Sequence, residues 1–136
     1  MAYPGETLEH LKTSAAFIKW QQDFWTQGLT PGSEQYNLNY AGVNEQMFIA
    51  TAYPGTAMWN TVRSKLQHHF DISFDSTGNP VCDDKFHQYV LELDDATKVL
   101  NDKNGRPVNF GEMPIKTFLK AREYIDSGQI EKVLEI

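Results

Sequence analysis

The chain has 136 residues, of which 40% are hydrophobic and 22% charged, and its formal net charge is -6. A chain of this length and composition can bury about two thirds of its unfolded surface, so we expect one folded domain over residues 1–136. The acidic balance disfavours a nucleic-acid-binding face, which needs Lys and Arg to neutralise phosphates. No stretch approaches the roughly 18 apolar residues of a membrane span, and the first twelve residues show no export signal. The single Cys82 fits a reducing compartment, and we expect a cytoplasmic protein.

The first expected helix carries two apolar faces. It begins at Glu6 or Thr7, after a Pro-Gly turn, and ends at Gly28. At about 100° per residue, one face gathers Leu8, Leu11, Ala15, Ile18 and Trp25, and three rings lie nearly opposite: Phe17, Trp20 and Phe24. A surface helix of a small domain normally buries one face. The rings are therefore either sandwiched inside the fold or covered by another molecule.

Two strands are expected next. The alternation of Tyr36, Leu38 and Tyr40 with polar residues over residues 35–40 is the period-2 pattern of a half-buried strand. Residues 41–44 are typical of a turn. Residues 47–53 are apolar and rich in aromatic and β-branched types, so they predict a second strand that pairs back on the first.

A second helix and a hairpin follow. Thr56 caps a helix whose apolar residues recur at helical spacing up to Phe70. Residues 72–74 predict a short strand, 75–80 a loop, and 85–93 a longer strand with four side chains on one face: His87, Tyr89, Leu91 and Leu93. The segment 94–100 fits either a helical turn or a strand.

The last third predicts a turn and two helices. Asn104-Gly105 indicates a turn, and Pro114 suits the start of a third main helix that stops at Ser127-Gly128. Residues 129–136 fit a short final helix. The fold expected from these elements is α+β: an antiparallel sheet of four to five strands covered by three main helices. The tetrapeptide Ala-Tyr-Pro-Gly occurs at residues 2–5 and 52–55, but its flanks differ, which favours common turn chemistry over a duplication.

Histidines are the first candidates for catalysis or metal binding. If the second helix packs on the hairpin, His69, His87 and Asp71 could converge on one pocket. The alternative for each imidazole is a satisfied core side chain. Nothing in the sequence indicates a cofactor or a metal: the calcium-like run from Asp71 to Asp75 lacks the Gly and the Glu that its loop requires. Cys82 lies next to two acids, which suppress a thiolate.

The segment between residues 71 and 95 is strongly acidic. It contains seven carboxylates and a single Lys. Such a run keeps loops and strand edges soluble, and it can also bind a basic partner through Asp83, Asp84, Asp94 and Asp95. A nucleic-acid platform built from Tyr36, Tyr40 and Phe48 is disfavoured, because few basic residues accompany the rings.

Two functions from different classes remain. The first is a small protein-binding factor, such as an inhibitor, immunity-type protein, chaperone or adaptor, that uses Phe17, Trp20 and Phe24 together with the acidic segment. Its partner is another protein or a second copy of this chain, since self-association is the commonest use of such a surface. The second is a small enzyme or ligand-binding domain with the histidine pocket. The sequence favours the first function and leaves open whether the protein is an enzyme.

Overall fold

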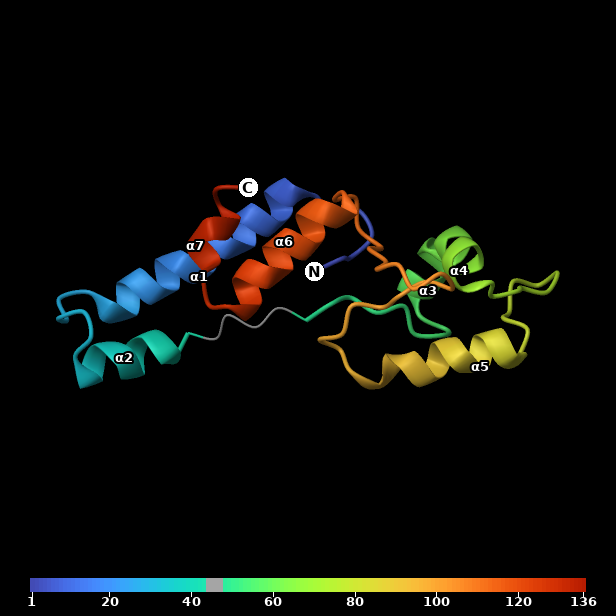
Figure 1. Cartoon of the computed structure of the whole chain (residues 1–136), viewed down its shortest axis with the longest axis horizontal. Coiled ribbons are helices and arrows are strands. Elements are labelled where there is room, and N and C mark those ends of the chain that lie inside the picture. Colours follow the sequence, from blue (N-terminus) through green and yellow to red (C-terminus); the bar gives the residue numbers. More distant parts are fainter. Residues whose placement is uncertain (44–47) are drawn as a thin grey trace. The chain divides into compact units, whose positions relative to one another are not determined.

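A computed structural model describes residues 1–43 and 48–136 (Figure 1). Its helices are α1 (Leu8–Thr26), α2 (Glu34–Ala41), α3 (Ala57–Thr61), α4 (Arg63–Phe70), α5 (Asp84–Leu91), the 3-10 helix η1 (Glu92–Asp94), α6 (Ile115–Asp126) and α7 (Ile130–Val133). In the described ranges, β structure is confined to two isolated bridges, Phe74 with Pro80 and Asn101 with Pro107. The expected α+β fold with a sheet of four to five strands is therefore wrong, and the described chain is mainly helical.

The chain forms two compact units. Unit 1 contains residues 1–6 and 48–115, and unit 2 contains residues 7–47 and 116–136. Helices α3, α4, α5 and η1 belong to unit 1, and α1, α2, α7 and nearly all of α6 belong to unit 2. The expectation of one domain over residues 1–136 stays a prediction.

Residues 35–40, expected as a strand, lie in helix α2. The Ser33 side chain caps this helix by accepting a hydrogen bond from the Tyr36 backbone N–H at 3.2 Å. Tyr36 and Tyr40 lie four residues apart and stack with ring centroids 6.1 Å apart. An every-second-residue pattern also contains i,i+4 pairs, so it fits a helix as well as a strand. Of the second expected strand, residues 48–53 have no regular secondary structure and residue 47 lies outside the described residues. Residue 44, the last of the turn expected at 41–44, lies outside them as well.

The longer strand expected over residues 85–93 is also helical, as α5 and η1. Asp83 caps α5, because its carboxylate accepts the Phe86 backbone N–H at 3.0 Å. Tyr89 is buried, but Leu91, expected beside it on one strand face, is 75% exposed. Residues 94–100 contain the end of η1 and a turn.

Unit 1 is built around Trp59 of α3. The indole contacts the rings of Phe74, Phe86 and Tyr89, with centroids 5.6–6.2 Å away. The Tyr89 hydroxyl donates a hydrogen bond of 2.7 Å to the Ala52 carbonyl. The second helix expected from Thr56 onward is present, but it is interrupted at Val62 into α3 and α4.

Two loops of unit 1 share one sequence pattern and one structure. Residues 75–81 and 102–108 both follow Asp-x-x-Gly-x-Pro-Val. The Asp75 and Asp102 carboxylates each accept backbone N–H groups two and four residues ahead at 2.8–3.0 Å. Gly78 and Gly105 adopt positive φ angles of 84° and 74°, as these tight reversals require. The expected turns at both places are confirmed, each closed by an isolated bridge.

Unit 2 is organised by α1, which packs against α7 and α2. Thr7 caps α1 in a reciprocal capping box with His10, which confirms the expected start of this helix. The third main helix and the final short helix are also present, as α6 and α7. The buried side chains of unit 2 come from these helices: Leu11, Ala15, Gln22, Thr26, Phe118, Ala121, Ile125, Ile130 and Val133.

Candidate functional site

The exposed aromatic surface of α1 is the strongest candidate site. Phe17, Trp20 and Phe24, which we call the aromatic face, are 58%, 58% and 55% exposed. Neighbouring rings are stacked, with centroids 5.8 Å apart for Phe17 and Trp20 and 5.7 Å apart for Trp20 and Phe24. The three rings therefore form a continuous apolar ridge along the helix, and within unit 2, over its described residues, this ridge is more than half exposed.

The opposite side of α1 provides the packing of unit 2. Leu11 and Ala15 are fully buried there, and this side continues through Gln22 and Thr26. Trp25 was expected on this stripe, but it is 58% exposed and contacts Phe24 edge-on at 5.7 Å. The helix thus has one buried side and one open side, as its two apolar faces allow.

The surroundings of the aromatic face are mainly uncharged. At 100° per residue, the side chains beside the rings are Thr13, Ser14, Ala16, Gln21, Asp23 and Gln27. The charge of Asp23 is balanced by Lys19, with which it forms an i,i+4 ion pair. Any partner of this face therefore meets apolar rings bordered by small or amide side chains and, on one edge, by this ion pair.

Helix α2 is attached to the end of α1 and carries an exposed apolar side chain of its own. The Asn39 side-chain amide donates a hydrogen bond of 2.7 Å to the Trp25 carbonyl, which ties α2 to the last turn of α1. Leu38 on α2 is 62% exposed. Figure 1 shows α2 running back beneath the second half of α1.

The exposed area is sufficient for the centre of an interface. An aromatic side chain buries about 150–250 Å² when fully enclosed, and each ring exposes more than half of its surface. The three rings therefore present on the order of 300–400 Å², within the size of the largest patch on a typical monomer, which is often functional. A standard interface covers about 800 Å² on each partner.

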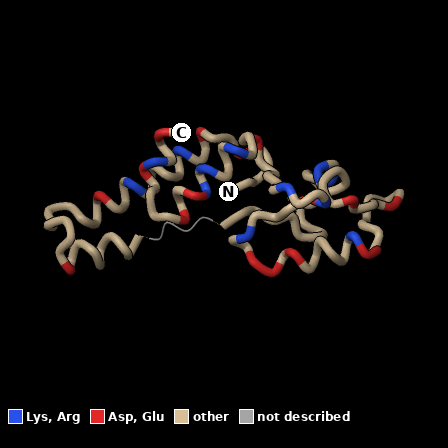
Figure 2. The backbone as a smooth tube through the Cα atoms, viewed as in Figure 1, with Lys and Arg blue, Asp and Glu red and all other residues tan. Residues whose placement is uncertain are grey.

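Most of the proposed acidic contacts have roles inside unit 1. Figure 2 shows the acidic positions along α5 and the segment after it. Asp83 is the cap of α5, and Asp95 accepts the backbone N–H and the hydroxyl of Thr97 at 2.8 and 2.6 Å. Asp94 lies 3.9 Å from the Lys98 ammonium. Asp84 is exposed in the first turn of α5, where a carboxylate interacts favourably with the helix dipole.

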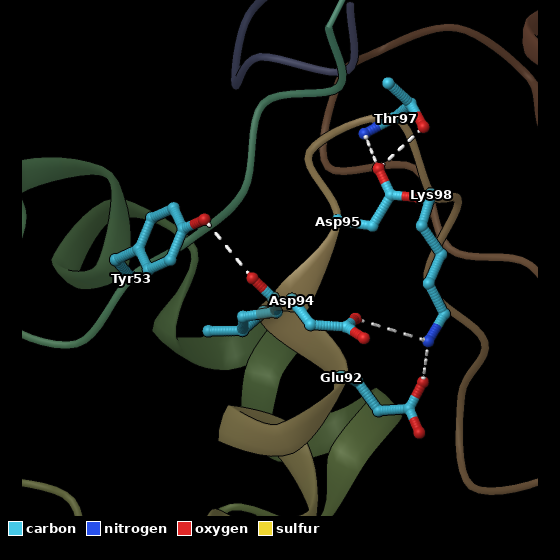
Figure 3. Close-up of polar contacts among 7 residues, drawn as sticks. Tyr53, Glu92, Asp94, Asp95, Thr97 and Lys98 are labelled. Carbon is cyan, nitrogen blue, oxygen red and sulfur yellow. Dashed lines mark hydrogen bonds and ion pairs between the residues drawn. The ribbon is translucent and has the colours of Figure 1, made fainter.

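Lys98 lies at the centre of the polar contacts after η1 (Figure 3). Its ammonium donates a hydrogen bond to the Glu92 carboxylate and approaches Asp94, and the bond to Glu92 raises the pKa of the ammonium. The Tyr53 hydroxyl donates to the Leu93 carbonyl at 3.4 Å. These contacts attach η1 to the loop that follows and neutralise part of the acidic segment.

The structure places His69 near an acid, but a different one from that expected. The His69 Nδ1 lies 3.9 Å from an Asp102 carboxylate oxygen, and the His69 ring contacts His68 at 4.9 Å. Burial and the neighbouring His68 lower the pKa of His69, while Asp102 acts in the opposite direction. Both histidines and Asp102 line a surface cavity of about 640 Å³.

The other two members of the expected histidine site are occupied elsewhere. Asp71 forms an ion pair of 2.6 Å with Lys103. His87 lies exposed on α5, where its ring contacts Phe86, and it lines neither this cavity nor the neighbouring one of about 480 Å³. The longer strand of the expected hairpin, residues 85–93, which carried His87 and was to form one wall of the site, is helical. Across residues 1–43 and 48–136, no group of three His, Cys, Asp or Glu side chains could hold a metal ion.

The sheet surface considered for base stacking does not form within the described ranges. Tyr36 and Tyr40 lie on α2 of unit 2, and Phe48 belongs to unit 1. None of the described helices combines the length and the hydrophobicity that crossing a membrane requires.

Comparison of the chain with protein-family models, characterised proteins and solved structures finds no match. The geometry of the site is therefore the only guide to function. Sequence reasoning missed Trp25 and Leu38 as exposed apolar residues and Asp102 as the neighbour of His69. The sequence does contain a signal for the turn that holds Asp102, because residues 102–108 repeat the pattern of residues 75–81.

Proposed function

We propose that this chain is a small protein-binding factor that docks on its partner through the aromatic face of α1. The observation that supports the proposal is the exposure of Phe17, Trp20 and Phe24 on a helix whose opposite side already packs against its own unit. Exposed aromatic residues that cluster at one place are the typical energetic centre of a protein interface. The rings themselves carry no charge, and the nearest charged residues, Lys19 and Asp23, are paired at one edge, which matches the depletion of charge at interface cores.

The acidic segment is a secondary element of this proposal. Asp83 and Asp95 serve the local fold, so a basic partner would be attracted mainly by Asp84 and Asp94. Such exposed charges steer association more than they hold the complex together. The proposal keeps a cytoplasmic location, which a single exposed Cys82 fits.

The alternative enzyme with a histidine pocket has less support. His69 meets one carboxylate at 3.9 Å, but His87 and Asp71 make contacts elsewhere. The cavity near His69 holds no group that the structure activates as a nucleophile, within the residues that line it.

The test is a comparison of retained proteins. The full chain with a C-terminal tag is incubated with lysate of its source cells, alongside the variants Trp20→Ala and Leu91→Ala. Leu91 is an exposed apolar residue of unit 1, so Leu91→Ala controls for non-specific hydrophobic binding. We expect defined proteins, which include untagged copies of this chain, to be retained by the wild type and by Leu91→Ala and lost from Trp20→Ala.

Circular dichroism accompanies the assay, because the comparison requires folded variants. Unfolding of Trp20→Ala would show that the ring supports the fold and would contradict the proposal. Equal retention by all three proteins would contradict it as well.

A further inference from the structure

The aromatic face has the spacing of a coiled-coil seam. Phe17, Trp20 and Phe24 follow steps of three and four residues, and the same steps reach Thr13 and His10 in one direction and Gln27 in the other. The apolar residues therefore occupy the middle of this line, and polar residues occupy both ends. The residues on the reverse side, Ala15 and Gln22, are buried within unit 2.

We propose that the aromatic face pairs with the same face of a second copy of this chain, with the two α1 helices antiparallel. This inference rests on the proposed function and names its partner. An isologous pair closes on itself and leaves no further free ring surface. The antiparallel arrangement also opposes the two helix dipoles.

Ring-to-ring contact and the length of the helix together select one register. In antiparallel pairs, the two classes of seam position face each other. If Phe17 faces Trp20 of the second copy, Thr13 faces Phe24 and His10 faces Gln27. This register overlaps α1 along nearly its whole length, Leu8–Thr26. The aromatic residues then gather at the two-fold axis and the polar residues lie at the rim, as in most protein interfaces.

The charges beside the seam permit this pairing in an acidic protein. In the same register, Ser14 lies beside Gln21 of the second copy, and Ala16 lies beside Asp23. Like charges therefore do not meet along either flank, although the chain carries a net charge of -6. Asp23 is in addition partnered by Lys19 of its own helix.

The available area predicts a reversible dimer. Two copies contribute on the order of 600–800 Å² from the rings alone, about half of a standard interface of about 1,600 Å². The small and amide side chains along the flanks add to this area. An interface of this size and shape can associate without being obligate, so the dimer is sought over a range of protein concentrations.

The first experiment measures mass. Sedimentation equilibrium is performed from about 10 μM to about 1 mM on the full chain. We expect the wild type to move from the 15.6 kDa of one chain towards twice that mass. Trp20→Glu places like charges at the axis and should remain monomeric, whereas Leu91→Glu, an equal change of charge on α5, should still dimerise. A wild type that stays monomeric at 1 mM overturns the inference.

The second experiment measures orientation. In a Cys82→Ser background, Ser14→Cys and Gln21→Cys are prepared as separate chains and treated with a short bis-maleimide. The mixture of the two should form cross-linked dimers in high yield, and each variant alone should not. Efficient cross-linking of Ser14→Cys with itself indicates parallel helices and overturns the inference.

The two proposals fail in different ways. The wild type could be monomeric and still retain lysate proteins through Trp20. This result would show that the partner is not a second copy of the chain, but it would leave the docking function intact. A dimer that persists in Trp20→Glu overturns the inference. If Trp20→Ala also leaves the retained lysate proteins unchanged, the proposed docking function is overturned as well.

Discussion

The two units use the same kind of side chain in opposite ways. In unit 1, Trp59 is enclosed by Phe74, Phe86 and Tyr89 and is 1% exposed. In unit 2, Trp20 stacks between two phenylalanines at nearly the same centroid distances, yet it is 58% exposed. Ring contacts alone therefore do not distinguish a core from a surface.

The difference lies in where the neighbours come from. The rings around Trp59 belong to two separate segments, the loop that carries Phe74 and the helix α5 that carries Phe86 and Tyr89, so they approach it from more than one direction. The rings around Trp20 all lie on one helix and can only stack along its surface. A one-dimensional ladder of this kind leaves one side open, and only another element or another molecule can cover it.

The largest expected effect is on the enclosed ring. Trp59→Ala should lower the free energy of unfolding by about 3–5 kcal/mol, because it removes the centre of the unit 1 core. The Trp59 Nε1 has no hydrogen-bond partner within the described residues, so the loss is one of packing. Trp20→Ala should change stability by less than about 0.5 kcal/mol. Urea unfolding of both variants measures the contrast, and equal effects would abolish the distinction between the two clusters.

The next effect concerns the polar end of the enclosed cluster. Tyr89→Phe keeps the ring but leaves the Ala52 carbonyl without its donor, which should cost about 1–3 kcal/mol. Burial raises the pKa of Tyr89, and the nearby Tyr53 adds to the shift. Because the folded pKa lies above the unfolded value, this stabilising contribution is complete below about pH 10 and declines as pH rises beyond it.

The measurement for Tyr89 combines denaturation with absorbance of tyrosinate. Tyr36→Phe on α2 is the matched control, because it removes a hydroxyl from a ring of unit 2. We expect the alkaline loss of stability to become shallower in Tyr89→Phe. An unchanged alkaline profile would argue that the hydroxyl is accessible to solvent.

A smaller effect separates two neighbouring acids of the acidic segment. Asp83→Ala removes the cap of α5 and should cost about 1 kcal/mol. Asp84→Ala removes only a first-turn charge and should cost a few tenths of a kcal/mol. Thermal unfolding of the two variants compares them directly. Equal losses would indicate that general acidity, and not the cap, supports the helix that carries Phe86 and Tyr89.

The smallest effect is expected at the edge of the unit 1 core. Because the pKa of His69 is lowered by burial and by His68, the folded state resists its protonation. The resulting stabilising contribution is complete above about pH 6.5 and is lost as pH falls through that value towards the folded pKa. Stability measured between pH 7.5 and 5.5 should therefore decline less in His69→Gln than in the wild type. A steeper decline of stability in the variant would show that the pKa of His69 is raised, not lowered, in the folded state.

The sequence allowed some elements to be predicted and not others. Helices α1, α6 and α7 were expected, because their caps and stop signals agree with their apolar spacing. Residues 35–40 and 85–93 were misassigned as strands, because alternation there coincides with helical i,i+4 pairs. Ser33 and Asp83 were the signals that could have decided both cases.

The candidate site shows a similar division. The two apolar faces of α1 follow from helical geometry alone, and so could be seen in the sequence. The side that packs within unit 2 depends on α7 and α2, which the spacing of α1 does not encode. The separation of His69 from His87 depends likewise on α5 being a helix.

The twin loops at residues 75–81 and 102–108 have a consequence for how unit 1 assembles. Each reversal contains hydrogen bonds between residues at most eight positions apart, but the second is also tied to a distant segment, because the Lys103 N–H donates to the His69 carbonyl at 2.9 Å. Local reversals of this size form in about 1–10 μs, well before most domains complete folding. Helix α5, which carries Phe86 and Tyr89, follows the first loop directly, so the reversal at residues 75–81 can form before these rings pack against Trp59.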